Sequence, residues 1–145
     1  MGTLHFSITI KAPSKKVWST MLEQETYRIW TAEFSEGSYF EGSWEEGEKI
    51  RFLGPGGSGG MSSVIAEHKP YRFISIKHRG IIKDGIEDTE SPEAKVWSGY
   101  ENYSFDERGG ITELKVDITA IPAEFEQEMA DAWPKALARL KSLCE

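Results

Sequence analysis

Cysteine, histidine and basic residues are scarce in this chain, and each scarcity argues against a class of function. The one cysteine, Cys144, cannot form an internal disulfide, which fits a reducing compartment. Acidic residues outnumber basic ones by 24 to 17, and the basic ones form no stripe that could neutralise nucleic-acid phosphates or an anionic lipid surface. We therefore expect no nucleic-acid partner.

Long apolar runs are also missing. No run approaches the roughly 20 residues that cross a bilayer, and the N-terminus lacks the charged-then-apolar layout of a signal peptide. We expect a cytoplasmic protein without membrane insertion. The 145 residues suffice for a single domain over residues 1–145, and a chain of this size builds a core without disulfides or metal.

The three histidines show no metal-motif spacing, so we expect no metal and no cofactor. His5 lies on the polar face of a predicted strand, and His68 precedes a turn. His78 differs, because it shares strand parity with Ile74 and Ile76 and could point into the interior as a hydrogen-bonding group.

Nucleophilic catalysis and phosphate binding receive no support from local motifs. Cys144 lies next to the terminus, and no signature surrounds any serine, so we assign no catalytic residue. The glycine-rich run 54–60 precedes a strand and is followed by no lysine, which favours a flexible hairpin over a phosphate loop. The acidic segment 80–94 lacks EF-hand spacing, and we interpret it as an exposed loop.

Hydrophobic periodicity predicts the order of elements. Alternation over residues 3–10 predicts a strand, Ser14 is the expected N-cap of a first helix, and a second short helix carries Tyr27 and Trp30. Further strands are predicted at residues 38–44, 48–53, 61–68, 71–78, 95–105 and 111–120.

The strongest helix prediction begins after Pro122. Acidic residues crowd its first half and basic residues its second half, which complements the helix dipole. Pro134 predicts a bend within it. The apolar stripe along this helix consists of Phe125, Met129, Trp133, Leu137 and Leu140.

Together these elements predict an α+β fold with a curved antiparallel sheet of about seven strands, two short helices and one long C-terminal helix. A strongly twisted sheet of this size has a concave face, and one helix covers that face incompletely, which leaves a cavity. Which parity of strand 95–105 faces inward stays open. The expected ligand-binding residues are Trp30, Phe40, Phe52, Ile76, His78, Trp97, Tyr103, Met129 and Trp133.

Short motifs at characteristic spacing support this fold. They are Ala12-Pro13-Ser14 with Val17-Trp18, then Trp30, the run Glu67-His68-Lys69-Pro70-Tyr71-Arg72-Phe73, and Trp133 with Leu137 and Leu140-Lys141. Over about residues 5–143 the sequence resembles the activator of Hsp90 ATPase homologue family, within the START/Bet v 1-like (SRPBCC, polyketide cyclase-like) superfamily. The resemblance implies a helix-grip fold and a module that binds a ligand or a partner.

The main functional hypothesis is non-catalytic binding of a small hydrophobic or amphipathic molecule, such as a lipid, a sterol-like or an aromatic compound. The resemblance also implies two alternatives. One is a chaperone-partner role like that of the Hsp90 ATPase activators. The other is a cyclase- or hydrolase-like enzyme that uses the cavity, with His78 and either a cavity acid or Tyr103 as acid–base groups.

Overall fold

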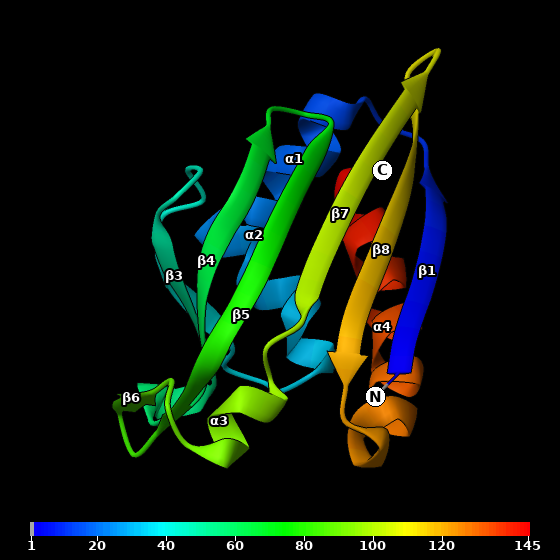
Figure 1. Cartoon of the computed structure of the whole chain (residues 1–145). Helices are drawn as coiled ribbons and strands as arrows, with labels where there is room; N and C mark the ends of the chain where they lie inside the picture. The colour runs from blue at the N-terminus through cyan, green and yellow to red at the C-terminus, as the bar shows by residue number, and fades with distance from the viewer. Residues whose placement is uncertain (1) are drawn as a thin grey trace.

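A computed structural model describes residues 2–145 and shows a curved antiparallel sheet with helices on one face (Figure 1). The sheet has eight strands in the order β1-β8-β7-β5-β4-β3-β2, with β6 paired to β5. The strands are β1 (Gly2–Ile10), β2 (Tyr39–Gly42), β3 (Lys49–Leu53), β4 (Gly59–Lys69), β5 (Phe73–Lys83), β6 (Ile86–Asp88), β7 (Tyr100–Arg108) and β8 (Ile111–Ile121).

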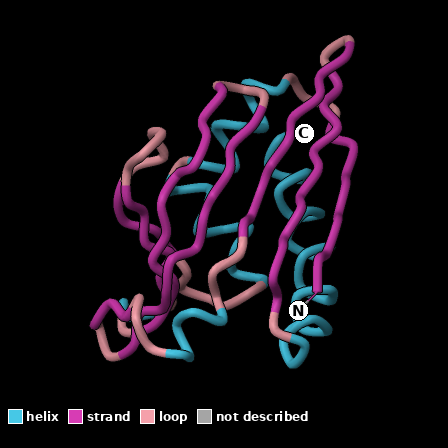
Figure 2. Tube along the Cα trace, viewed as in Figure 1, coloured by secondary structure: helices cyan, strands magenta, loops and turns pink. Residues whose placement is uncertain are grey.

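Helices cover the concave face and connect the two edges of the sheet. Figure 2 shows α1, α2 and α4 behind the strands, with the α1–α2 pair carrying the chain from edge strand β1 to edge strand β2. The helical segments are α1 (Ser14–Leu22), α2 (Gln24–Trp30), η1 (Thr31–Glu33), η2 (Pro55–Gly57), α3 (Pro92–Val96) and α4 (Ala123–Cys144). The predicted α+β class with a long C-terminal helix is confirmed, and α3 adds a further short helix to the two that were predicted.

The alternation in β1 is confirmed in space. Leu4, Phe6 and Ile8 face the core and pack beneath α4, whereas His5 and Ser7 face solvent. β1 pairs with β8, and Phe6 lies opposite Val116. Because both strands place apolar side chains on the same face, they form an apolar floor for the C-terminal helix.

The long helix α4 runs from Ala123 to Cys144 and is not interrupted at Pro134. Trp133, Leu137 and Leu140 are buried against the sheet and α1, as the predicted stripe requires. The bend at Pro134 stays a prediction.

The predicted loop 80–94 and strand 95–105 are wrong at their boundaries. β5 continues to Lys83 and turns back into β6, so part of the acidic segment is sheet. Residues from Pro92 to Val96 form α3, because the Ser91 hydroxyl caps the Ala94 amide and proline suits the first helical turn. The strand β7 therefore begins only at Tyr100.

The predicted N-cap is also one residue off. Ser14 is the first residue of α1, and Pro13 occupies the cap position without a side-chain hydrogen bond. The Ser14 amide instead donates to Glu107 Oε1 at 2.6 Å. A carboxylate from β7 therefore satisfies an amide that a local cap would otherwise serve.

A β-bulge in β5 lies next to His78. Ser63 pairs with His78 and Ser62 with Gly80, so Arg79 is an extra residue between them. The His78 amide donates to the Gly99 carbonyl at 2.9 Å. Gly99 also lies close against β8, where a Cβ would be 2.1 Å from the Thr119 carbonyl oxygen, so only glycine fits at this position. The bulge interrupts the ladder directly after His78, which faces the concave side in phase with Ile74 and Ile76.

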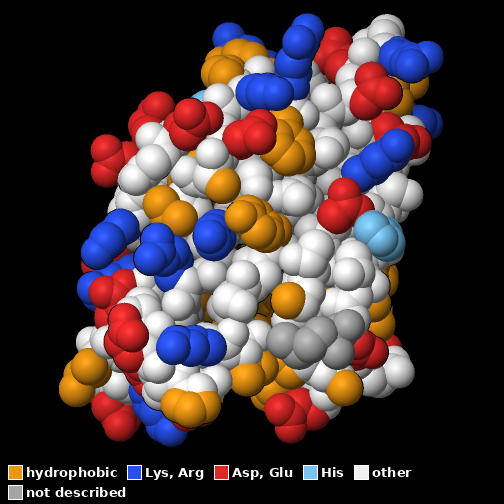
Figure 3. Space-filling view, viewed as in Figure 1, with side chains coloured by type: hydrophobic (Ala, Val, Ile, Leu, Met, Phe, Trp, Pro, Cys, Tyr) orange, Lys and Arg blue, Asp and Glu red, His pale blue; other side chains and the backbone are white. Residues whose placement is uncertain are grey.

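The opposite face of the sheet is polar. Figure 3 shows basic and acidic side chains mixed over it, with hydrophobic ones occurring between them. Within residues 2–145, no helix combines the length and apolar character needed to cross a membrane.

Candidate functional site

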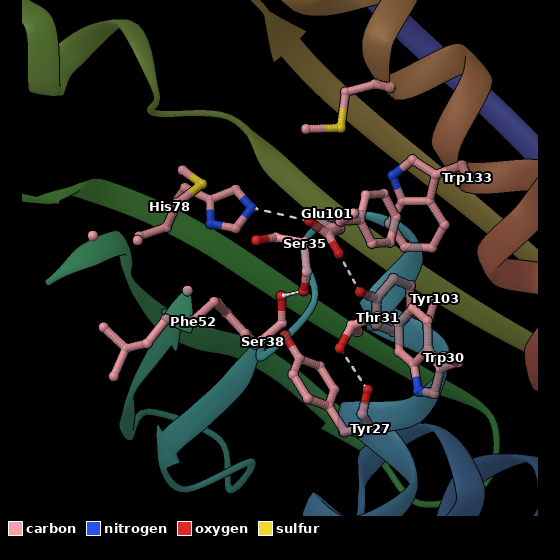
Figure 4. Close-up of a pocket in the computed structure, with 17 residues that line it drawn as sticks. Tyr27, Trp30, Thr31, Ser35, Ser38, Phe52, His78, Glu101, Tyr103 and Trp133 are labelled. Carbon is pink, nitrogen blue, oxygen red and sulfur yellow. Dashed lines mark hydrogen bonds and ion pairs between the residues drawn. The ribbon is translucent and has the colours of Figure 1, made fainter. Parts of the chain in front are cut away.

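A cavity of about 350 Å³ lies between the concave sheet face, the α2–η1 segment and α4 (Figure 4). This volume lies at the lower end of the range for small-molecule sites. Its wall is mostly apolar and aromatic. The lining residues are Tyr27, Trp30, Thr31, Phe34, Ser35, Ser38, Phe52, Leu53, Gly54, Gly59, Gly60, Met61, His78, Glu101, Tyr103, Met129 and Trp133.

Trp133 of α4 is the centre of the aromatic wall. Its ring centroid lies 4.9 Å from Phe34, 6.0 Å from Trp30 and 6.1 Å from Tyr103, and Phe6 stacks on it from β1. Trp30 is fixed by its indole N–H, which donates to the Met21 carbonyl at 3.1 Å. Rings held in this way give the cavity a preformed apolar surface.

A chain of polar groups crosses the sheet at the floor of the cavity. His78 Nδ1 lies 2.7 Å from Ser63 Oγ, and His78 Nε2 lies 3.2 Å from Glu101 Oε1. The Tyr103 hydroxyl donates to the other oxygen of Glu101. Figure 4 shows Glu101 between the imidazole and the phenol. Three adjacent strands, β4, β5 and β7, thus contribute to one network.

The partners of each group define its hydrogen-bonding role. A carboxylate only accepts, so His78 Nε2 carries a proton toward Glu101. In the neutral imidazole, Nδ1 then accepts from the Ser63 hydroxyl, and this pair of contacts selects the tautomer. Burial raises the pKa of Tyr103 well above its ordinary value, and the charge of Glu101 raises it further. Tyr103 therefore keeps its proton and remains the donor.

Burial also raises the pKa of Tyr27, followed in importance by the charge of Glu101. Tyr27 packs edge-on against Trp30, and its carbonyl accepts from the Thr31 hydroxyl at 2.6 Å. Both buried tyrosines of the wall are neutral phenols in the ordinary pH range.

The hydrogen bonds from Ser63 to His78 and from His78 to Glu101 have the residue types of a hydrolase triad. Ser63 is only 1% exposed and does not line the cavity. A nucleophile must reach its substrate, and Ser63 does not reach a molecule bound in this cavity. We therefore assign Ser63 a positioning role toward His78.

Six of the nine residues predicted for the site line this cavity. They are Trp30, Phe52, His78, Tyr103, Met129 and Trp133. Trp97 lies in a neighbouring space of about 40 Å³ and packs on Phe125. The residues that border both spaces are Met61, His78, Glu101 and Met129. Phe40 and Ile76 are instead core residues: Phe40 packs on Tyr27 and Trp44, and Ile76 is fully buried beside the cavity.

Glu101 is the charged side chain of the cavity wall, and it was not among the residues predicted from the sequence. The inward parity of β7 consists of Glu101, Tyr103 and Phe105. The sequence places Glu101 at the same strand parity as Tyr103 and Phe105, but it did not show which parity of this strand faces inward. The glycine run contributes Gly54, Gly59 and Gly60 to the wall, while residues 80–94 contribute none.

The other two histidines have structural contacts. His5 pairs with Asp117 at 2.5 Å on the exposed face, and His68 Nδ1 lies 2.7 Å from the Trp44 carbonyl oxygen. Over the described residues 2–145, no three Cys, His, Asp or Glu side chains converge as metal ligands do.

Comparisons with known proteins agree with this architecture. The family model of the activator of Hsp90 ATPase homolog 1-like protein matches residues 11–145. The structure of the Aha1 dimer from Colwellia psychrerythraea is similar with a TM-score of 0.76 at 18% identity, covering 100% of this chain and 97% of that one. Protein MLL2253 from Mesorhizobium loti gives a TM-score of 0.73 at 12% identity, covering 98% and 96%.

CalU16 from Micromonospora echinospora gives a TM-score of 0.68 at 18% identity, covering 97% of this chain and 73% of that one. No curated protein matches the chain. At these identities the structural neighbours show the fold, which is START/Bet v 1-like, while the family model covers nearly the whole sequence. The chain belongs to the activator of Hsp90 ATPase homolog 1-like family.

Proposed function

We propose that this protein binds a small, largely apolar molecule, without catalysis, in the cavity between the sheet and α4. The observation that carries the proposal is the preformed cavity itself, with aromatic rings on its wall and one polar cluster on its floor. Apolar walls supply affinity, and a few placed polar groups orient the ligand. The family's fold supports a ligand-binding or cyclase-like function.

Titration with a panel of apolar and aromatic compounds tests the proposal. Trp30 and Trp133 line the cavity, so a ligand there is expected to change intrinsic tryptophan fluorescence saturably. Binding to the folded state also stabilises it, by about 2.7 kcal/mol at a ligand concentration 100 times Kd, and raises the melting temperature.

A blocked variant provides the control. Met129→Trp with Ser35→Trp narrows the cavity from two sides, because both positions line it. Glu128→Trp with Glu36→Trp places the same side chains at exposed neighbouring positions. The blocked variant is expected to lose the thermal shift and the matched variant to keep it. Absence of a saturable response across the panel, or equal binding by the blocked variant, contradicts the proposal.

The His78–Glu101 pair favours one second candidate, an acid–base enzyme. His78 carries a proton toward Glu101 at the cavity floor, and such a pair could shuttle a proton to a bound substrate. For any reaction found in a substrate screen, His78→Ala together with Tyr103→Phe is expected to lower kcat by at least about 100-fold. Turnover that survives both changes excludes these roles.

A further inference from the structure

We propose that the cavity selects ligands with a hydrogen-bond-donating head group, neutral or cationic, and rejects anionic ones. This inference rests on the proposed function and adds to it the chemical class of the ligand. It concerns one end of the molecule, the polar head that meets the cavity floor, while the apolar body faces the aromatic wall.

The first argument is the charge inventory of the cavity. Among the 17 lining residues, Glu101 is the one carboxylate, and neither lysine nor arginine occurs. An anionic head group thus finds no lysine or arginine in the wall to pair with. The hydroxyls of Thr31 and Ser38 donate to the Tyr27 and Ser35 carbonyls within their own segments. They are committed to local structure.

The second argument is the remaining hydrogen-bonding capacity of Glu101. A carboxylate offers about four acceptor sites, and His78 and Tyr103 each occupy one. The Glu101 side chain is 20% exposed and borders the cavity. Two acceptor sites are therefore free for a ligand O–H or N–H. A polar group that is partly buried and short of partners gains most from such a donor.

The third argument is rigidity. The imidazole of His78 is held on both ring nitrogens, and the phenol of Tyr103 is 2% exposed. Neither group can turn to offer its proton to an anion without leaving Glu101 or Ser63 unpaired. The network therefore presents a fixed acceptor to the ligand. Repulsion between a ligand carboxylate and Glu101 adds to this, since charges a few ångströms apart interact strongly away from bulk water.

Three naphthalene compounds that differ in their head group test the inference. They are naphthylmethanol, naphthylmethylamine and naphthoate, and calorimetry at about pH 8 keeps ordinary histidines neutral. We expect the alcohol and the amine to bind at least about tenfold more tightly than naphthoate. In Glu101→Gln, we expect the preference for the amine over naphthoate to fall to within about threefold.

Glu128→Gln is the matched control, because it removes the same charge from an exposed position beside Met129 and outside the cavity. It is expected to keep the parent's preference. Circular dichroism verifies that each variant is folded. Equal or tighter binding of naphthoate by the parent, or an unchanged preference in folded Glu101→Gln, overturns the inference and leaves the proposed function standing. If none of the compounds binds while the parent is folded, the inference fails, and the broad panel decides the proposed function separately.

Discussion

Replacing Trp133 with alanine is expected to lower the free energy of unfolding by about 3–5 kcal/mol. The indole is 3% exposed and contacts four aromatic rings from three parts of the chain. Its removal merges a new void with the existing cavity and separates α4 from β1. Urea unfolding followed by far-ultraviolet circular dichroism measures the loss.

Trp97→Ala is the comparison for that change. Trp97 is half-buried and packs on one ring, Phe125. We expect Trp97→Ala to lower the free energy of unfolding by about 1–2 kcal/mol, because the Trp97 side chain buries less apolar surface on folding than Trp133 does. If Trp133→Ala costs no more than Trp97→Ala, then Trp133 does not hold the helix on the sheet as we describe.

Stability is expected to fall steeply above about pH 10 because of Tyr27 and Tyr103. Burial raises the pKa of both hydroxyls in the folded state. In the unfolded chain they lose their protons near pH 10, so there the folded state binds more protons. The stabilisation from the two groups is fully present below that pH. Above it, each group lowers the free energy of unfolding by up to about 1.4 kcal/mol per pH unit.

Urea unfolding between about pH 9 and pH 11 measures this slope. Tyr103→Phe and Tyr27→Phe are each expected to make the slope shallower, whatever their effect on stability at neutral pH. Tyr71 is exposed, so Tyr71→Phe is expected to leave the slope unchanged. An identical slope in all four proteins contradicts the assignment of buried, protonated phenols to the cavity wall.

Strands and helices with a regular hydrophobic period were predictable from the sequence. The cavity-wall residues that lie on these elements were predictable for the same reason. Period-two alternation in β1 and β8 and the stripe on α4 define the core faces, and the structure places Trp133 and Met129 of that stripe in the cavity wall. His78 was placed by its parity with Ile74 and Ile76. These signals lie within a few residues of the position that they predict.

The remaining features depend on pairing between distant segments. Glu101 reaches His78 because β7 pairs with β5 in a register that sets Glu101 opposite Ile76, the inward-facing position next to His78. No local period encodes a register between strands 23 residues apart. Aromatic residues on both parities of 95–105 also concealed the short helix α3, which a serine cap and a proline begin.

Phe40 and Ile76 show a second limit. Both have the composition and parity of cavity residues, yet other side chains cover them. An apolar inward position predicts burial, whereas lining a cavity depends on what packs above it. The bulky neighbours Tyr27 and Trp44 cover Phe40, and their positions follow from the tertiary fold.

The methyl groups of the methionines test the central claim most directly. Met61 and Met129 line the cavity from β4 and α4, whereas Met21 is fully buried in α1 away from it. With carbon-13-labelled methionine methyls, binding of naphthylmethanol is predicted to shift the Met61 and Met129 signals and to give nuclear Overhauser contacts to both, with Met21 unchanged. Binding that leaves Met61 and Met129 unchanged would place the ligand elsewhere and contradict the account.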